Sequence, residues 1–233
     1  MHNRHTFPAA AVFVSSLALT LAPAAVATST PKVTVRIEGK SRTLLGATTV
    51  QTRSGSITKG GAPSGACPAS SAQGALNVAT KGRWSGKFDS NLKSYFVTKI
   101  LGDTESGKKA FWELLVNDLP AQSGFCAAKL HSGDRVLFAV VGASGAAAAP
   151  IRVTAPRIAV VGQSVTVKAV YYNTKGKAKP LSGATLKVGS HTAQTGSAGA
   201  VSFTPTHTGT IKVAASKTGY IRDEASVRVM GSA

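Results

Sequence analysis

Alternating apolar and polar side chains mark the first predicted strand of the chain. Val33, Val35 and Ile37 alternate with polar neighbours, which is the period of a strand with one buried face. Further runs with strand character follow at residues 43–51, 94–101, 111–117 and 135–141. The first half of the chain is therefore expected to be built mainly from strands.

One segment of this half has the period of a helix instead. Its apolar residues are spaced three and four apart and fall on one face: Ala72, Ala75, Leu76 and Ala79. Ser70 is placed to cap the helix, with Gln73 three residues later, and Gly82 closes it. The predicted order is two strands, a helix and three strands. A helix laid across one face of a small mixed sheet predicts an α+β fold.

The second half consists of short alternating runs separated by turn signals. The runs lie at residues 164–172, 184–188, 200–204, 210–215 and 225–230. This spacing is typical of an antiparallel β-sandwich. A stretch of Gly, Ala and Ser that ends at Pro150 separates the two halves, as a linker does. The predicted units are residues 28–141 and 151–233, joined by a linker at 142–150, and the predicted fold is mainly β with one helix.

The N-terminus predicts an exported protein. Arg4 precedes an apolar stretch that runs from Phe7 to Ala24 and is interrupted by prolines. The small residues that follow indicate cleavage after Ala27, which makes residues 1–27 a signal peptide. A membrane anchor is the alternative, but the stretch is short and ends in a cleavage site. We expect a secreted, extracellular chain without a transmembrane segment, held at the cell wall, if at all, by non-covalent contacts.

The charge balance adds an expectation about partners. The chain has 27 Lys and Arg against 9 Asp and Glu, a formal charge of +18, with a hydrophobic fraction of 43%. That fraction is normal for a globular chain, which excludes a disordered basic tail. Outside a cell, such a charge attracts polyanions such as teichoic acids, anionic lipids and sulfated glycans. The alternative is that the charge only keeps the protein soluble. Sequence-specific nucleic-acid binding is not expected, since no such motif is present.

Two cysteines, Cys67 and Cys126, follow the predicted cleavage point. In an exported chain they predict a disulfide that closes a loop of about 60 residues, for which the chain-entropy estimate is roughly 4 kcal/mol. The alternative is two free thiols, one of which could act as a nucleophile beside a histidine or a helix N-terminus.

The residue pattern does not favour catalysis or a metal site. His131, His191 and His207 have no metal-ligand spacing, although His191 and His207 could meet across neighbouring strands. The acidic residues Asp103 and Asp118 fit turns, so no carboxylate pair suited to acid–base chemistry is indicated. Gly102 to Lys108 has the spacing of a phosphate loop, but Lys109 replaces the required Ser or Thr. We expect a non-catalytic protein without a metal.

Aromatic residues supply the candidate ligand site. Phe111 and Trp112 must point to opposite faces of their predicted strand. One of the two should join the core, and the other should lie under a loop or meet a ligand. Trp84, Trp112 and Asn117 are the candidate binding residues, because aromatic faces and a side-chain amide suit sugars or planar rings.

Both halves resemble known families. The segments 33–39, 111–117 and 133–138 are similar to a domain of unknown function in secreted Gram-positive proteins, related to the C-terminal domain of the cobalamin carriers transcobalamin and intrinsic factor. That resemblance implies a β-grasp-like domain and cobalamin as a ligand. The segments 180–184, 199–203 and 217–220 resemble bacterial immunoglobulin-like or carboxypeptidase-regulatory-like modules. Such modules act as spacers or adhesive units.

The expected function follows from export, charge and the absence of catalytic motifs. We expect a secreted, non-catalytic binding or adhesive protein of the bacterial envelope, with envelope polyanions or glycans as partners. One alternative is a small-ligand protein that binds a cobalamin-like molecule. Another is a targeting module that delivers a separate wall-active enzyme to the cell wall.

Overall fold

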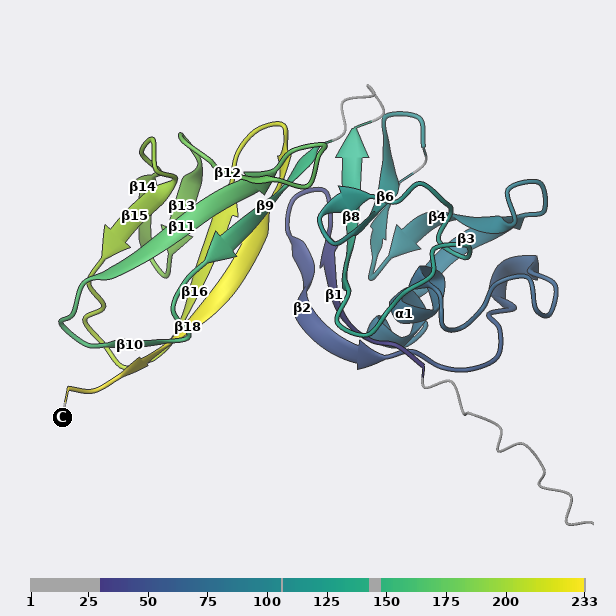
Figure 1. Cartoon of the computed structure of the whole chain (residues 1–233), viewed down its shortest axis with the longest axis horizontal. Helices are drawn as coiled ribbons and strands as arrows, with labels where there is room; N and C mark the ends of the chain where they lie inside the picture. Colours follow the sequence, from purple (N-terminus) through teal and green to yellow (C-terminus); the bar gives the residue numbers. More distant parts are fainter. Residues whose placement is uncertain (1–29, 106, 143–147, 233) are drawn as a thin grey trace, which may run out of the picture.

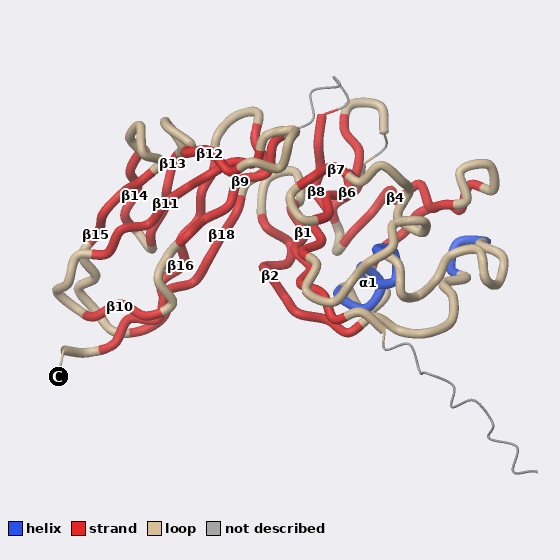
Figure 2. Tube along the Cα trace, viewed as in Figure 1, coloured by secondary structure: helices blue, strands red, loops and turns tan. Residues whose placement is uncertain are grey.

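The computed structural model describes residues 30–105, 107–142 and 148–232, arranged as two units side by side (Figure 1). Strands dominate both units, and the described part contains one α-helix (Figure 2). This is the mainly β, α+β fold class that the sequence predicts. The predicted signal peptide, with its cleavage point after Ala27, lies outside the described residues.

The first unit is built on a mixed sheet with the strand order β2-β1-β8-β6-β7. Its strands are β1 (Lys32–Glu38), β2 (Thr43–Gln51), β6 (Ala110–Val116), β7 (Leu119–Pro120) and β8 (Arg135–Gly142). Strand β1 pairs antiparallel with β2 and parallel with β8. A hairpin, a helix and a strand that returns parallel to the first strand form a β-grasp-like arrangement.

Helix α1 (Ala72–Ala79) begins one residue later than expected, after a short 3-10 turn, η1 (Lys59–Gly61). The cap is Ser71, whose Oγ accepts a hydrogen bond from the Gly74 amide at 3.4 Å. The amides of Ala72 and Gln73 donate to carbonyls of residues 128 and 125. A loop distant in sequence therefore satisfies the first turn and decides where the helix starts. Gln73, expected to cap, is instead fully buried.

A second, three-stranded sheet contains a strand that the sequence pattern did not reveal. It consists of β3 (Trp84–Asp89), β4 (Ser94–Ile100) and β5 (Asp103–Thr104). Strand β3 passes so close to β4 that a Cβ on Gly86 would lie 2.6 Å from the carbonyl oxygen of Phe96. The register shifts at Gly86, because a glycine within a strand permits a bulge and a close approach.

The core of the first unit lies between α1, the main sheet and the small sheet, and includes Trp84, Trp112 and Phe138. Cys67 and Cys126 form the predicted disulfide, with their Cα atoms 4.7 Å apart. The bond joins the segment before α1 to the loop after β7, and both cysteines lie in this core. It ties together the two loops that support the start of the helix.

The second unit is a sandwich of two sheets. One has the order β10-β18-β16-β13-β14, and the other has the order β12-β11-β9-β17, with β15 paired to β11. The strands are β9 (Ala149–Thr154), β10 (Ile158–Val160), β11 (Val165–Tyr172), β12 (Ala178–Pro180), β13 (Thr185–Val188), β14 (His191–Gln194), β15 (Ala200–Phe203), β16 (Gly209–Ser216), β17 (Tyr220–Ile221) and β18 (Asp223–Met230). Between the sheets lies an aliphatic core centred on Val167, Leu186 and Val213. The second unit is thus a β-sandwich, in line with the mainly β fold predicted from the sequence.

Two details of the second unit differ from the sequence prediction. The pairs β10–β18 and β17–β9 are parallel, so the sandwich is not wholly antiparallel. The expected linker, 142–150, is too long at both ends, because Gly142 belongs to β8 and Ala149 already pairs with Tyr220. Residues 143–147 of that segment lie outside the described residues. Pairing with β17 draws the end of the expected linker into the sandwich.

Candidate functional site

Both faces of the central strand β8 are buried, and the two units meet on one of them. Val136 and Phe138 point into the core of the first unit. Leu137 and Val141 pack instead with Ile221 of the second unit. The second unit therefore covers part of the sheet face opposite α1. In Figure 1, β2 and β1 lie next to β9 and β18.

Charged side chains surround this apolar contact. Arg36 and Glu38 occupy alternate positions of β1 and point away from the core of the first unit. The guanidinium of Arg36 pairs with Asp223 of the second unit, and its Nε lies 3.7 Å from Oε1 of Glu38. From the other side, Arg222 lies 3.8 Å from Oε2 of Glu38. Ion pairs between side chains distant in sequence thus connect the units.

Hydrogen bonds to the backbone fix the same residues. Arg222 donates to the carbonyl oxygens of Gly39 at 2.9 Å and Lys40 at 2.8 Å. Asp223 Oδ2 accepts a hydrogen bond from the amide of Val153 at 2.7 Å. Such charge-assisted hydrogen bonds are stronger than neutral ones. The geometry holds β1 against the start of β18.

Burial at this contact shifts two pKa values. Burial raises the pKa of Glu38 to about 7, although Arg36 and the hydroxyl of Thr43 act in the opposite direction. Burial also lowers the pKa of Arg36 to about 10, opposed by the charge of Glu38. In both residues desolvation outweighs the attraction of the partner. Keeping Glu38 and Arg36 charged at the contact therefore costs free energy, because burial removes water from both groups.

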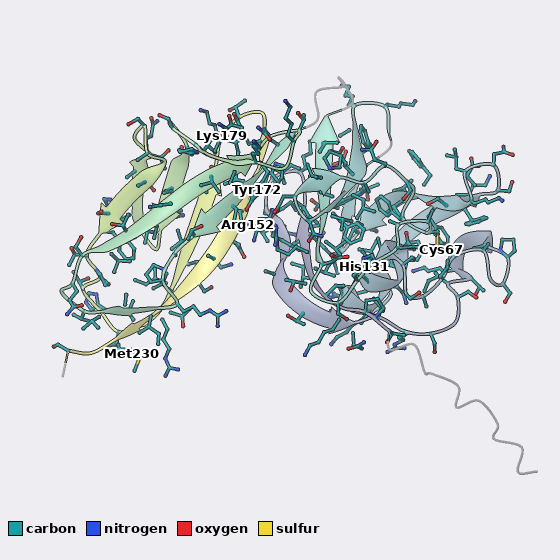
Figure 3. All side chains as sticks on the ribbon, viewed as in Figure 1. Cys67, His131, Arg152, Tyr172, Lys179 and Met230 are labelled. Carbon is teal, nitrogen blue, oxygen red and sulfur yellow. A yellow bond between two sulfur atoms is a disulfide. The ribbon has the colours of Figure 1, made fainter. Side chains whose placement is uncertain are left out.

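A second ionic cluster centres on Asp118, in the turn between β6 and β7. Its carboxylate is 7% exposed and accepts hydrogen bonds from Arg135 of the first unit and Arg152 of the second, the latter at 2.7 Å. Two guanidiniums thus share one carboxylate. Arg152 also lies 5.6 Å from the ring centre of Tyr172, and Figure 3 shows it between the two units.

These clusters line a cavity of about 400 Å³ between the units. Its charged lining consists of Arg36, Arg135, Arg152, Arg157, Asp118, Asp223 and Glu224. Clefts at domain boundaries are common ligand sites, and planar guanidiniums match the oxygens of carboxylates and phosphates. We take this interdomain cleft as the candidate functional site. Its chemistry suits the binding of an oxyanion.

The three binding residues predicted from the sequence do not form a site. Trp84 and Trp112 are 2% and 5% exposed and belong to the core of the first unit. The Trp84 indole donates to Asn77 Oδ1 at 2.9 Å. Asn117 is exposed, and its amide bridges Asp134 and the backbone of Arg135, which joins the turn after β6 to the start of β8. The structure does not bring these three residues together in one pocket, because core packing and hydrogen bonds already engage them.

Two of the histidines, His191 and His207, lie in the same groove of the second unit. His191 of β14 and His207, which precedes β16, line one groove of about 600 Å³ at the end of the sandwich, but they do not lie on neighbouring strands. His207 Nδ1 lies 2.9 Å from the hydroxyl of Thr206. In the described ranges, no group of three or more His, Cys, Asp or Glu side chains is placed to hold a metal ion.

Sequence reasoning missed the acidic residues of the interface. The sequence pattern indicates only that Asp118 fits a turn and that the first strand has one buried face. The second face is covered by another unit, so Arg36 and Glu38 are not solvated. The available signal was a weak one: the charged triplet Arg222, Asp223 and Glu224 stands at the start of a strand.

Comparisons with known proteins cover only part of the chain. Residues 70–141 match a family model described as a domain of unknown function, DUF4430. The matched range contains the motifs at 111–117 and 133–138 but not the one at 33–39. No curated protein matches the chain.

Among solved structures, one similar chain is that of the red sea bream transglutaminase, at 21% identity with a TM-score of 0.27. The alignment covers 41% of this chain and 16% of that one, and a likeness this low carries no argument about fold or activity. Within the described residues, no helix has the length and apolarity needed to cross a bilayer. What the comparisons support is thus a DUF4430-like segment, residues 70–141, in the first unit.

Proposed function

We propose that this chain is a secreted, non-catalytic binding protein of the bacterial envelope, whose two joined units present a cationic exterior to anionic polymers. The predicted signal peptide at 1–27 and the disulfide between Cys67 and Cys126 support export. The proposed location is extracellular, with non-covalent retention at the cell wall. The proposal involves no chemical step, and the interface carboxylates act in it as fixed counter-ions.

One observation carries the proposal. All nine Asp and Glu residues are buried or half-buried, whereas every lysine except Lys217 is exposed. Several of the acids lie at the contact between the units, where they pair with arginines. Carboxylates are thus withdrawn from the surface, and the exterior is more one-sided in charge than the composition alone indicates. A surface of one sign attracts polyanions over a distance set by the ionic strength.

Retention of the mature chain on purified Gram-positive cell walls tests this function. We expect retention at low ionic strength, a steep loss in moderate salt, and a loss when anionic polymers are removed from the walls. Retention that does not respond to salt, or no retention at low salt, contradicts the proposal.

A pair of matched variants tests whether the charge acts as a whole. Lys175, Lys177 and Lys179 are exposed on the second unit, and Lys87, Lys99 and Lys109 are exposed on the first. Replacing either group by glutamine removes three positive charges without removing a buried contact. Diffuse attraction predicts that both triple variants lose wall retention to a similar extent. A loss confined to one group would replace the whole-exterior proposal with a local site.

No contact among the described residues favours the cobalamin-like alternative. The two tryptophans of the candidate ligand site, Trp84 and Trp112, are both enclosed in the core. The targeting of a separate enzyme is likewise not favoured by a particular contact. The proposed function therefore remains polymer binding.

A further inference from the structure

Positive charge is in excess on one side of the interdomain cleft. Around Glu38, the cations Arg36, Arg222 and Lys212 are matched by the carboxylates of Glu38, Asp223 and Glu224. Around Asp118, two guanidiniums share a single carboxylate. The Asp118 side of the cleft therefore has one positive charge that is not matched within the cluster.

Arg157 adds a further positive charge to the cleft. It lies between β9 and β10 and lines the same cavity. Within the described ranges, its side chain forms no ion pair and no hydrogen bond, although its carbonyl oxygen accepts from the amide of Arg228 at 2.9 Å. The backbone is thus held in place while the guanidinium is exposed. Its donors are available to a ligand.

Arg152 also retains unused donor capacity. Its Nη2 serves Asp118, at 2.7 Å to one oxygen and 3.1 Å to the other. Its buried Nε has no hydrogen-bond partner in the described structure. A buried donor without a partner is costly. Arg135, 44% exposed, pairs with the same carboxylate from the opposite unit.

The rest of the lining encloses these groups. Leu137, from the apolar contact between the units, contributes apolar wall to the cavity, and the hydroxyl-bearing Thr34 contributes a polar side chain. An apolar wall lowers the effective dielectric constant, so an anion inside interacts more strongly with guanidiniums than it does at the open surface. The cleft therefore differs from the exposed lysines in enclosure as well as in charge.

We propose that the interdomain cleft binds a phosphate group, with Arg157 and the Arg135–Arg152 pair as its donors. The inference rests on the proposed function and deepens it, because it names the chemical group of the envelope polymer that would occupy a defined site. Guanidiniums bind phosphate oxygens in a planar, bidentate manner. Two positive charges in excess match a phosphate monoester or hydrogen phosphate better than they match a carboxylate. Polymer retention would then combine diffuse attraction with one specific contact.

Titration of the mature chain with inorganic phosphate, followed by NMR of the backbone amides, tests the site. We expect saturable shifts that centre on residues of the cleft, and weaker binding of acetate. Arg157→Gln should weaken phosphate binding at least tenfold, which corresponds to about 1.4 kcal/mol. The matched control is Arg53→Gln, which removes the same charge from an exposed arginine that is not among the residues lining the cleft. It should leave phosphate binding unchanged.

Three results overturn the inference: shifts that do not saturate, equal weakening by Arg157→Gln and Arg53→Gln, or acetate binding as tight as that of phosphate. Glycerol phosphate and a purified polyol-phosphate polymer distinguish a free monoester from a polymer as the source of the group. If Arg157→Gln and Arg53→Gln reduce wall retention equally, and the cleft does not bind phosphate, the proposed function stands and the cleft site does not. If phosphate binds the cleft but cell walls do not retain the chain, the cleft site stands and the proposed function does not.

Discussion

The interface between the two units and the solvent-facing exterior use positive charge in different ways. At the interface the cations are mainly arginines, and they meet carboxylates within a few ångströms. The exterior carries almost all of the lysines. Guanidiniums are weakly hydrated and bind carboxylates in a fixed geometry, whereas ammonium groups are strongly hydrated point charges. The comparison teaches that arginines are used where the two units meet and lysines where the surface faces solvent.

Removal of an interface carboxylate should produce the largest effect. Asp223→Ala leaves Arg36 with one carboxylate partner fewer and removes the acceptor for the Val153 amide. Loss of one member of a buried ion pair costs about 3 kcal/mol or more. Urea unfolding should show this loss. Asp89→Asn, at the end of β3 and away from the interface, is the control and should cost far less. Equal losses of unfolding free energy in the two variants would mean that carboxylates at the interface stabilise the fold no more than those elsewhere.

The pH dependence of stability should reveal the buried acid. The pKa of Glu38 is raised to about 7 from the ordinary value of 4.5, so the folded protein binds this proton more tightly than the unfolded chain does. Stability contributed by the protonated form is therefore lost as the pH rises from about 4.5 to about 7. The size is on the order of 3 kcal/mol, at 1.36 kcal/mol per pKa unit.

Glu38→Gln isolates this effect, because the substituted side chain has no proton to release. Urea unfolding at pH 5 and pH 8 should show that the wild type loses more stability than Glu38→Gln over that interval. Other titrating groups are common to both proteins and cancel. Parallel stability curves would show that Glu38 has an ordinary pKa.

An exchange of cation type should give a smaller and more selective effect. Arg36→Lys keeps the charge but cannot reach Asp223 and Glu38 together with a planar fork, so we expect a loss of about 1–2 kcal/mol. Arg42→Lys, on the exposed turn after β1, should leave stability unchanged. Thermal unfolding measures both. Equal thermal stability of Arg36→Lys and Arg42→Lys would show that the interface does not need the planar guanidinium of Arg36.

The smallest effect on stability should come from the exterior. Lys187 is exposed on β13, and its side chain forms no ion pair or hydrogen bond among the described residues. Lys187→Gln should change the free energy of unfolding by less than about 0.5 kcal/mol. Its salt-dependent retention on cell walls should nevertheless fall slightly. A large loss of stability would show that the exterior charges also hold the fold.

Local patterns predicted much of the architecture. The segment 43–51 coincides with β2, and the predicted strand at 135–141 is β8 without its last residue. Both segments are rich in aliphatic and β-branched residues, which favour strands. Strand β3 escaped because Gly86 and the charged side chains around it weaken that pattern. The start of α1 escaped because carbonyls from a distant loop satisfy its first amides.

The candidate site could not be derived in the same way. Trp112 looked available to a ligand, because its strand has two faces and the sequence does not say what covers either one. The cleft depends on Arg135 and Arg152 reaching one carboxylate from two different units. That proximity is a product of docking and leaves no local pattern.

The amino-acid sequence by itself determined the export signal prediction, the excess of positive charge, the mainly β class and the pairing of the two cysteines. Each of these depends on composition or on the order of neighbouring residues. Only the tertiary structure decided that the second face of β1 and β8 meets another unit, and that acids gather there while lysines remain outside. The reason is physical: the pleat of a strand sets the direction of each side chain, but the free energy of burying it depends on residues brought there from elsewhere in the chain.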